Sequence, residues 1–229
     1  MQTVDNQIRA TLRSDIDPDF LRCLSVGIGW AYQDLFEDIQ SHSLVSPTGM
    51  RREFGHRRSS AIESAIVRVC RDRGVPFDWR RLEYNGQDKL IVKCGRVLLI
   101  HEAIPLDRRG PVAADYKRAL VGTHNITRQL ELDLGDIPGR IHDWSGDIVA
   151  TILHGSAGHA FDEKSRALGV LRIGVADGSY DSWIVNQDVT DFAMEGRPVP
   201  DFDTKNYQEQ TDRTRVVLRR QAKLNEQRK

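Results

Sequence analysis

The sequence predicts an α+β fold in which N-terminal helices pack on a mostly antiparallel or mixed sheet of about six to seven strands, built from two meanders. Apolar residues in the first third of the chain recur at spacings of three and four, which is typical of amphipathic helices. Short apolar runs bounded by turn residues follow in two blocks, at 82–104 and 147–189, and indicate buried strands. The end of the chain is basic, and we expect a C-terminal basic helix there.

The first expected helix spans residues 17–40. It starts at an aspartate followed by a proline, which suit the N-cap and the first helical position. Apolar residues then recur on one face for about six turns. Gly27 and Gly29 interrupt its middle and would permit close packing against another element. The polar residues 1–16 before it are expected to be loosely held.

The second expected helix spans residues 61–73. Ser60 and Glu63 fit a capping box, in which each side chain bonds the backbone N–H of the other. Gly74 follows at the position where a left-handed residue commonly ends a helix. Residues 41–58, before this helix, are expected to form a loop.

The first block of strands is expected to be an antiparallel meander with strands near 81–84, 88–93 and 96–103. The Asn85-Gly86 and Cys94-Gly95 pairs provide its turns. The chain at Gly95 is too short for a crossover helix, so adjacent strands must be antiparallel.

The second block is expected to contain strands at 147–153, 168–176 and 180–189. A connector at 154–167 and a hairpin turn at Asp177-Gly178 would join them. Residues 112–121 fit a short helix between the two blocks. Residues 126–134 fit either a strand or a helix, and that choice decides how the blocks join. We expect one sheet with helices on one face, and two small sheets are the alternative.

These elements are expected to form one domain over residues 1–193, with helices within 17–73 and the sheet within 81–191. A linker rich in Pro, Gly and Asp follows at 194–206, and a basic helix or tail at 207–229. Counted from Lys205, the tail holds eight basic and three acidic residues, so it carries +5 and the rest of the formally neutral chain carries −5. We expect such a tail to dock on the acidic body of the protein or on a neighbouring subunit, to bind another partner, or to fray.

Composition excludes several classes of protein. The three cysteines are widely spaced, which argues against a disulfide framework or a structural zinc site. There is no apolar run of the ~20 residues that a membrane span needs and no signal peptide, so we expect a cytoplasmic protein without a membrane partner. Arginine accounts for 26 of the 33 basic residues, a bias typical of GC-rich genomes that favours a bacterial or phage source. Motifs for simple nucleotide hydrolases, zincins and dinucleotide oxidoreductases are absent.

A first candidate site is a divalent-metal nuclease centre, because helix, antiparallel strands and acidic residues follow in an order similar in outline to the restriction-endonuclease-like core. That resemblance implies one acid on a strand and an acid-x-lysine on the next, with the acids holding Mg²⁺. In this sequence Glu63 would be an acid on the helix, Asp88 the first strand acid and Glu102 the second strand acid. The residue two after Glu102 is Ile104 rather than lysine, so the pattern is degenerate.

A second candidate site is the segment from His154 to His159, followed by Asp162 and Glu163. Two histidines and two carboxylates have the chemistry of metal ligands, although their spacing matches no known metal motif. A flexible glycine-serine connector is the alternative. His101, at the end of the central strands, is expected to point inward and to be hydrogen-bonded.

A third candidate is an anion-binding surface made of two arginine-rich segments, which would contact nucleic-acid phosphates in a salt-dependent manner. The arginines concerned are Arg51, Arg52, Arg57 and Arg58 in the expected loop, and Arg215, Arg219 and Arg220 in the tail. The expected loop lies directly before a helix N-terminus, which favours anions. A solvated surface loop is the alternative.

These observations favour a non-enzymatic binding or regulatory protein that engages a protein partner, a second copy of itself or a nucleic acid through the arginine-rich loop and the basic tail. No cofactor is expected for that function. The alternative is a nuclease with a degenerate restriction-endonuclease-like site, which would need Mg²⁺.

Overall fold

The computed structural model describes residues 4–41, 46–81, 88–108, 110–122, 148–158 and 161–195. Its helices are α1 (Val4–Asp15), α2 (Pro18–Ser41), α3 (Pro47–Arg73), α4 (Asp115–Gly122), the 3-10 helix η1 (Glu163–Arg166) and α5 (Val189–Met194). Its strands are β1 (Phe77–Arg81), β2 (Asp88–Cys94), β3 (Val97–Ala103), β4 (Ile148–Ser156), β5 (Leu168–Ala176) and β6 (Trp183–Asp188).

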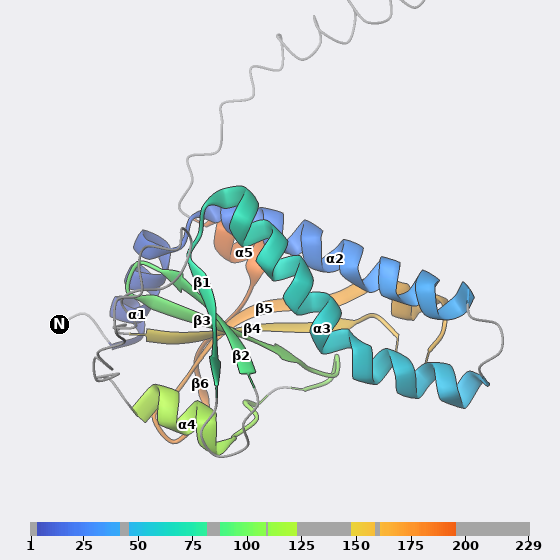
Figure 1. Ribbon diagram of the computed structural model, residues 1–229. Helices are drawn as coiled ribbons and strands as arrows, with labels where there is room; N and C mark the ends of the chain where they lie inside the picture. The colour runs from blue at the N-terminus through green and yellow to red at the C-terminus, as the bar shows by residue number, and fades with distance from the viewer. Residues whose placement is uncertain are drawn as a thin grey trace, which may run out of the picture. The chain divides into compact units, whose positions relative to one another are not determined.

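The strands of the described residues form one sheet in the order β1-β2-β3-β4-β5-β6 (Figure 1). Neighbouring strands are antiparallel except β3 and β4, which are parallel. Parallel neighbours need a crossover connection, and α4 lies within the connection from β3 to β4. The α+β class, the single mixed sheet and the N-terminal helices are therefore confirmed.

Helices cover both faces of the sheet. α2 and α3 lie side by side on one face, and α4 lies on the other (Figure 1). The larger core cluster joins α1, α2, α3 and α5 to strand residues such as Leu90, whereas Ile91, Leu98 and Ile100 form a smaller cluster against Tyr116 of α4. The expectation that helices cover only one face was wrong, because the crossover between β3 and β4 carries α4 to the opposite side.

The N-terminal residues are not loosely held, contrary to the expectation for 1–16. Val4–Asp15 form α1, and Leu12 and Ile16 are almost completely buried in the larger core cluster. Ile8 also packs against that cluster. These three residues recur at a spacing of four, but the stripe is short and its neighbours are polar, so it was not recognised as a helix.

Helix α3 begins much earlier than expected. Ser46 is its N-cap, with the Oγ accepting a hydrogen bond from Gly49 N at 3.2 Å, and Pro47 occupies the first turn. The predicted loop at 41–58 was therefore wrong over most of its length, and Ser60 lies inside a helix rather than at its start. Arginine and glutamate are good helix formers and continue the helix across this stretch.

The other helix predictions that fall on described residues are confirmed. α2 lies within one residue of its expected bounds, and α3 ends at Gly74, whose φ of 65° is left-handed. Gly27 permits the close approach of α2 to α3, since a Cβ there would lie 3.0 Å from Val69 Cγ2. Among the described helices, none combines the length and apolar character that crossing a bilayer requires.

The strands are of the expected type, but three of them differ in their bounds. The first strand lies at Phe77–Arg81 instead of 81–84, and β6 begins at Trp183 instead of at residue 180. β4 continues to Ser156, into the expected connector. Gly155 allows this extension because it has no Cβ. In any other residue, the Cβ would overlap the Ile104 carbonyl oxygen. The predictions for the Asn85-Gly86 turn, for 126–134 and for the C-terminal tail lie outside the described residues. The division into domain, linker and tail stays a prediction.

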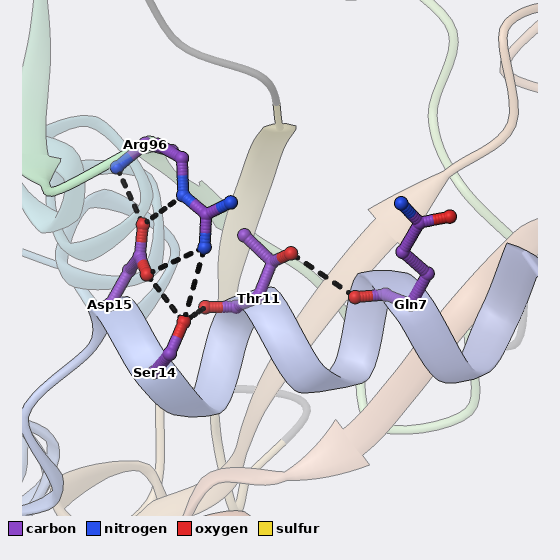
Figure 2. Close-up of polar contacts among 5 residues, drawn as sticks. All are labelled: Gln7, Thr11, Ser14, Asp15 and Arg96. Atoms are coloured by element: carbon purple, nitrogen blue, oxygen red, sulfur yellow. Dashed lines mark hydrogen bonds and ion pairs between the residues drawn. The ribbon is translucent and has the colours of Figure 1, made fainter.

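A carboxylate clamp fixes α1 to the turn between β2 and β3 (Figure 2). Arg96 N and Nε donate to Asp15 Oδ2 at 2.8 and 2.9 Å, and Ser14 donates to the other oxygen of the same carboxylate. These hydrogen bonds, those from Arg96 foremost, hold the pKa of Asp15 well below its usual range. The clamp therefore contributes its full stabilisation above about pH 4, and this contribution is lost as the pH falls from there toward the lowered pKa of Asp15.

Candidate functional site

A groove of about 460 Å³ opens between α3 and the edge strand β1. It is lined by one stripe of α3 and one side chain of β1: Ser60, Glu63, Ser64, Val67, Arg68, Arg71, Asp72 and Trp79. Residues three and four apart on a helix share a face, which explains why these α3 side chains meet in one place. The two arginines and two carboxylates make the groove polar and formally neutral.

The backbone of β1 alternates between groups bonded to β2 and groups directed away from it. A hydrogen bond from Lys93 N to the carbonyl before β1 fixes that alternation, and it turns the N–H and C=O of Phe77, Trp79 and Arg81 outward. In agreement, Trp79 N donates to the Asp78 carboxylate at 2.8 Å rather than to β2. Within the described ranges, no strand pairs with this outer edge.

Trp79 gives the groove a fixed aromatic wall. Its side chain is 45% exposed, which is unusual for a large aromatic residue. The ring packs edge-on against Phe77 with centroids 5.6 Å apart, and the Arg71 guanidinium lies 5.8 Å above the Phe77 ring. These contacts hold the tryptophan in place while leaving nearly half of its surface to solvent.

A chain of four polar side chains runs through the interior, between the helices and the sheet. The Tyr32 hydroxyl on α2 lies 2.9 Å from His154 Nδ1 on β4, and His154 Nε2 lies 3.3 Å from His101 Nδ1 on β3. His101 Nε2 in turn lies 3.1 Å from Glu63 Oε1 on α3. Tyr32 and His154 are 0% exposed, whereas the Glu63 side chain is 23% exposed. The chain therefore leads from the core to the groove.

Burial sets the charge state of the two deepest groups of this chain, Tyr32 and His154. Burial, followed by the charges of His101 and Arg58, lowers the pKa of His154 well below its ordinary value, and burial raises the pKa of Tyr32 to about 12. Both groups are therefore neutral at physiological pH. The Glu63 carboxylate accepts from His101 Nε2–H. Neutral His154 carries one N–H, so it donates to one of its two neighbours, Tyr32 or His101, and accepts from the other.

A guanidinium stands at the buried end of the chain. Arg58 lies close enough to Tyr32 for its charge to oppose the rise in the pKa of that hydroxyl, and the Arg58 Nε is buried without a hydrogen-bond partner among the described residues. Arg58 and Glu63 belong to the same helix, five positions apart. The chain thus connects a cation and a carboxylate of α3 through side chains of α2, β4 and β3.

The three predicted nuclease acids do not come together. Glu63 and Asp88 lie on the α3 side of the sheet, since Asp88 stands two residues before Leu90 in β2 and shares its face. Glu102 follows His101 in β3 and therefore points to the opposite face, toward α4. Among the described residues, no group of three or more His, Cys, Asp or Glu side chains is arranged to hold a metal ion.

Glu102 instead forms a mostly buried ion pair with Lys117 of α4. Lys117 Nζ lies 2.6 Å from Glu102 Oε2 and 2.8 Å from Val112 O, and the lysine is only 3% exposed. Burial lowers the pKa of Lys117, and the hydrogen bond to Glu102 partly offsets that shift. This pair anchors the crossover helix to β3, which gives Glu102 a structural role.

The arginines of the expected loop lie along α3, not before a helix N-terminus, so the reason for expecting an anion site there was wrong. Arg51 and Arg52 are exposed, but Arg57 is paired with Asp38 at 2.6 Å and with Glu53 at 3.1 Å. Arg58 points to the buried chain. The tail arginines Arg215, Arg219 and Arg220 lie outside the described residues.

Some residues of this site could be predicted from the sequence. The inward, hydrogen-bonded His101 is confirmed. His154 was a candidate metal ligand, but both of its ring nitrogens bond to protein side chains, and His159 lies outside the described residues. Tyr32 and the exposure of Trp79 were missed, and the only sequence signal for either is an aromatic residue within an amphipathic pattern.

Comparisons with protein-family models, with curated proteins and with solved structures found no match for this chain.

Proposed function

We propose that this chain is a non-enzymatic binding protein that captures an extended segment of a partner protein along β1, within the groove beside α3. The observation that supports this most is the outward-facing edge of β1 next to a half-exposed tryptophan. An extended peptide that adds to a sheet edge gains main-chain hydrogen bonds, and adjoining pockets read its alternate side chains. The regulatory role, the bacterial or phage source and the cytoplasmic location stay predictions.

The expected complex is weak and reversible. Each intermolecular backbone hydrogen bond contributes about 1 kcal/mol net, and burial of the Trp79 surface adds a few kcal/mol more. Association and ordering of the peptide oppose this by about 4 kcal/mol or more. A peptide must also displace the Asp78 carboxylate from Trp79 N. Affinities in the micromolar range follow from this balance.

Protein is favoured over nucleic acid as the partner because of the charges in the groove. Arg68 and Arg71 are balanced there by Glu63 and Asp72, whereas a phosphate backbone requires an excess of cations. The Mg²⁺-dependent nuclease receives no support from the positions of Asp88 and Glu102, which face opposite sides of the sheet.

Replacing Arg81 tests whether the backbone edge itself binds. Random peptides displayed on phage are selected against the full chain, and the affinities of enriched synthetic peptides are measured by fluorescence anisotropy. Arg81→Pro removes an outward N–H without removing a bond to β2, so binding should weaken about tenfold or more. Arg81→Ala removes the same side chain but keeps the N–H, and it should bind within about twofold of the natural protein.

Failure to enrich any peptide, or equal binding by the two Arg81 variants, would rule out strand capture at β1. Labelled DNA and RNA are measured in parallel at about 50 and 200 mM salt. Binding that is strong and falls steeply with salt would favour a nucleic-acid partner instead.

A further inference from the structure

Glu63 lies where the buried chain meets the groove, and only one of its two carboxylate oxygens is bonded to a described residue. His101 Nε2 donates to Oε1 at 3.1 Å, and Oε2 accepts no hydrogen bond from any described residue. We infer that this second oxygen binds a lysine or arginine of the partner segment, which makes Glu63 a specificity-determining residue of the groove. This role presupposes the proposed function, since it requires a peptide in the groove.

The buried chain holds the Glu63 carboxylate in place before any partner arrives. The His101 side chain is 7% exposed, and His154 behind it is completely buried, so neither ring is free to move away. A carboxylate fixed in this way loses little side-chain entropy when a ligand binds. It is also mostly shielded from solvent, so its attraction for a cation is screened less than on an open surface.

The charges along α3 predict the charges of the partner. Arg68 lines the same groove five residues after Glu63, which is about 7.5 Å along a helix. Side chains on one face of an extended peptide repeat every about 6.8 Å, so a peptide that runs along α3 can offer one side chain to each of these two residues. We therefore expect the preferred segment to carry a basic residue for Glu63 and an acidic residue two positions away for Arg68.

Three synthetic peptides test the role of Glu63. All three share a backbone of alternating valine and threonine with one glutamate, which is meant for Arg68. They differ at the position two residues from that glutamate, which is lysine, glutamine or a second glutamate. The natural chain should bind the lysine peptide about tenfold more tightly than the glutamine peptide, as a charge-assisted hydrogen bond predicts. Glu63→Gln should remove this preference. Glu63→Lys should reverse it in favour of the second glutamate.

His101 is expected to be a positioning residue for Glu63. His101→Gln retains an amide N–H that can donate to the carboxylate, and it should keep most of the preference for lysine. His101→Leu has no donor, so the preference should fall to about twofold or less while binding of the glutamine peptide is unchanged. A merely structural role for His101 would weaken the binding of both peptides equally.

The outcomes distinguish a failure of strand capture along β1 from a failure of the role of Glu63. If no peptide binds the natural chain, capture along β1 is wrong. If all three bind with the same affinity, or if Glu63→Lys does not reverse the preference, strand capture stands and the role of Glu63 is overturned.

Discussion

Replacing His154 with alanine is expected to lower the free energy of unfolding by about 3–5 kcal/mol. The imidazole joins Tyr32 to His101 at a site that is 0% exposed, so its loss leaves a hydroxyl and a ring nitrogen without partners. It also leaves a cavity at the centre of the helix–sheet interface. Urea denaturation of the full chain measures the change. A loss below about 1 kcal/mol would show that the buried chain is not a major contributor to stability.

A matched variant, His154→Leu, separates the titration of the imidazole from its volume. Burial lowers the pKa of His154, so below about pH 6.5 the unfolded chain binds a proton that the folded chain does not. The stability contributed by this group is complete above that pH and is lost as the pH falls. The unfolding free energy of the natural chain should therefore fall more steeply between about pH 6.5 and 5 than that of His154→Leu.

Replacing Trp79 with alanine is expected to weaken the binding of a selected peptide by about 30-fold or more, or about 2 kcal/mol. Trp79 is the largest exposed side chain in the groove, and its ring is already fixed against Phe77. A rigid aromatic surface gains contact area at little cost in entropy. Fluorescence anisotropy with the selected peptide measures the affinity.

Trp30 provides the control for this substitution. It is 61% exposed on α2 and does not line the groove, so Trp30→Ala removes a comparable exposed aromatic side chain elsewhere. Trp30→Ala should bind the peptide within about twofold of the natural chain. Equal effects of the two substitutions would mean that Trp79 is not part of the binding surface.

The fold could be predicted in class and in most elements, and the errors have physical causes. The start of α3 was misplaced because Ser60 and Glu63 imitate a capping box within a helix. The stronger signal, Ser46 followed by Pro47, lies in the stretch expected to be a loop. Once the helix begins there, the arginines lie along its length instead of before its N-terminus, and the anion site itself stays a prediction.

The faces of the acidic residues follow from strand register, which depends on the turn. Cys94 pairs with Val97 across the turn at Gly95, so Asp88 and Glu102 must fall on opposite faces. A short turn at Cys94-Gly95 was predicted, and the separation of these acids could have been deduced from it. The resemblance suggested a shared site because it rests on the order of the acidic residues along the chain and does not consider which face of the sheet each side chain occupies.

The buried chain could be predicted only in part. The inward orientation of His101 follows from strand alternation. The other members of the buried chain come from α2, α3 and β4, and the bonded pair Tyr32 and His154 is 122 residues apart in the sequence. Only tertiary packing brings those side chains together, so no local pattern reveals the chain.

Hydrogen exchange of the β1 backbone amides, with and without a selected peptide, tests strand capture most directly. Binding along the outer edge should slow exchange at Phe77, Trp79 and Arg81 and leave Asp78 and Arg80, whose N–H groups face β2, unchanged. Unchanged exchange at those three amides in the presence of a bound peptide would place the binding surface elsewhere and contradict the proposed function.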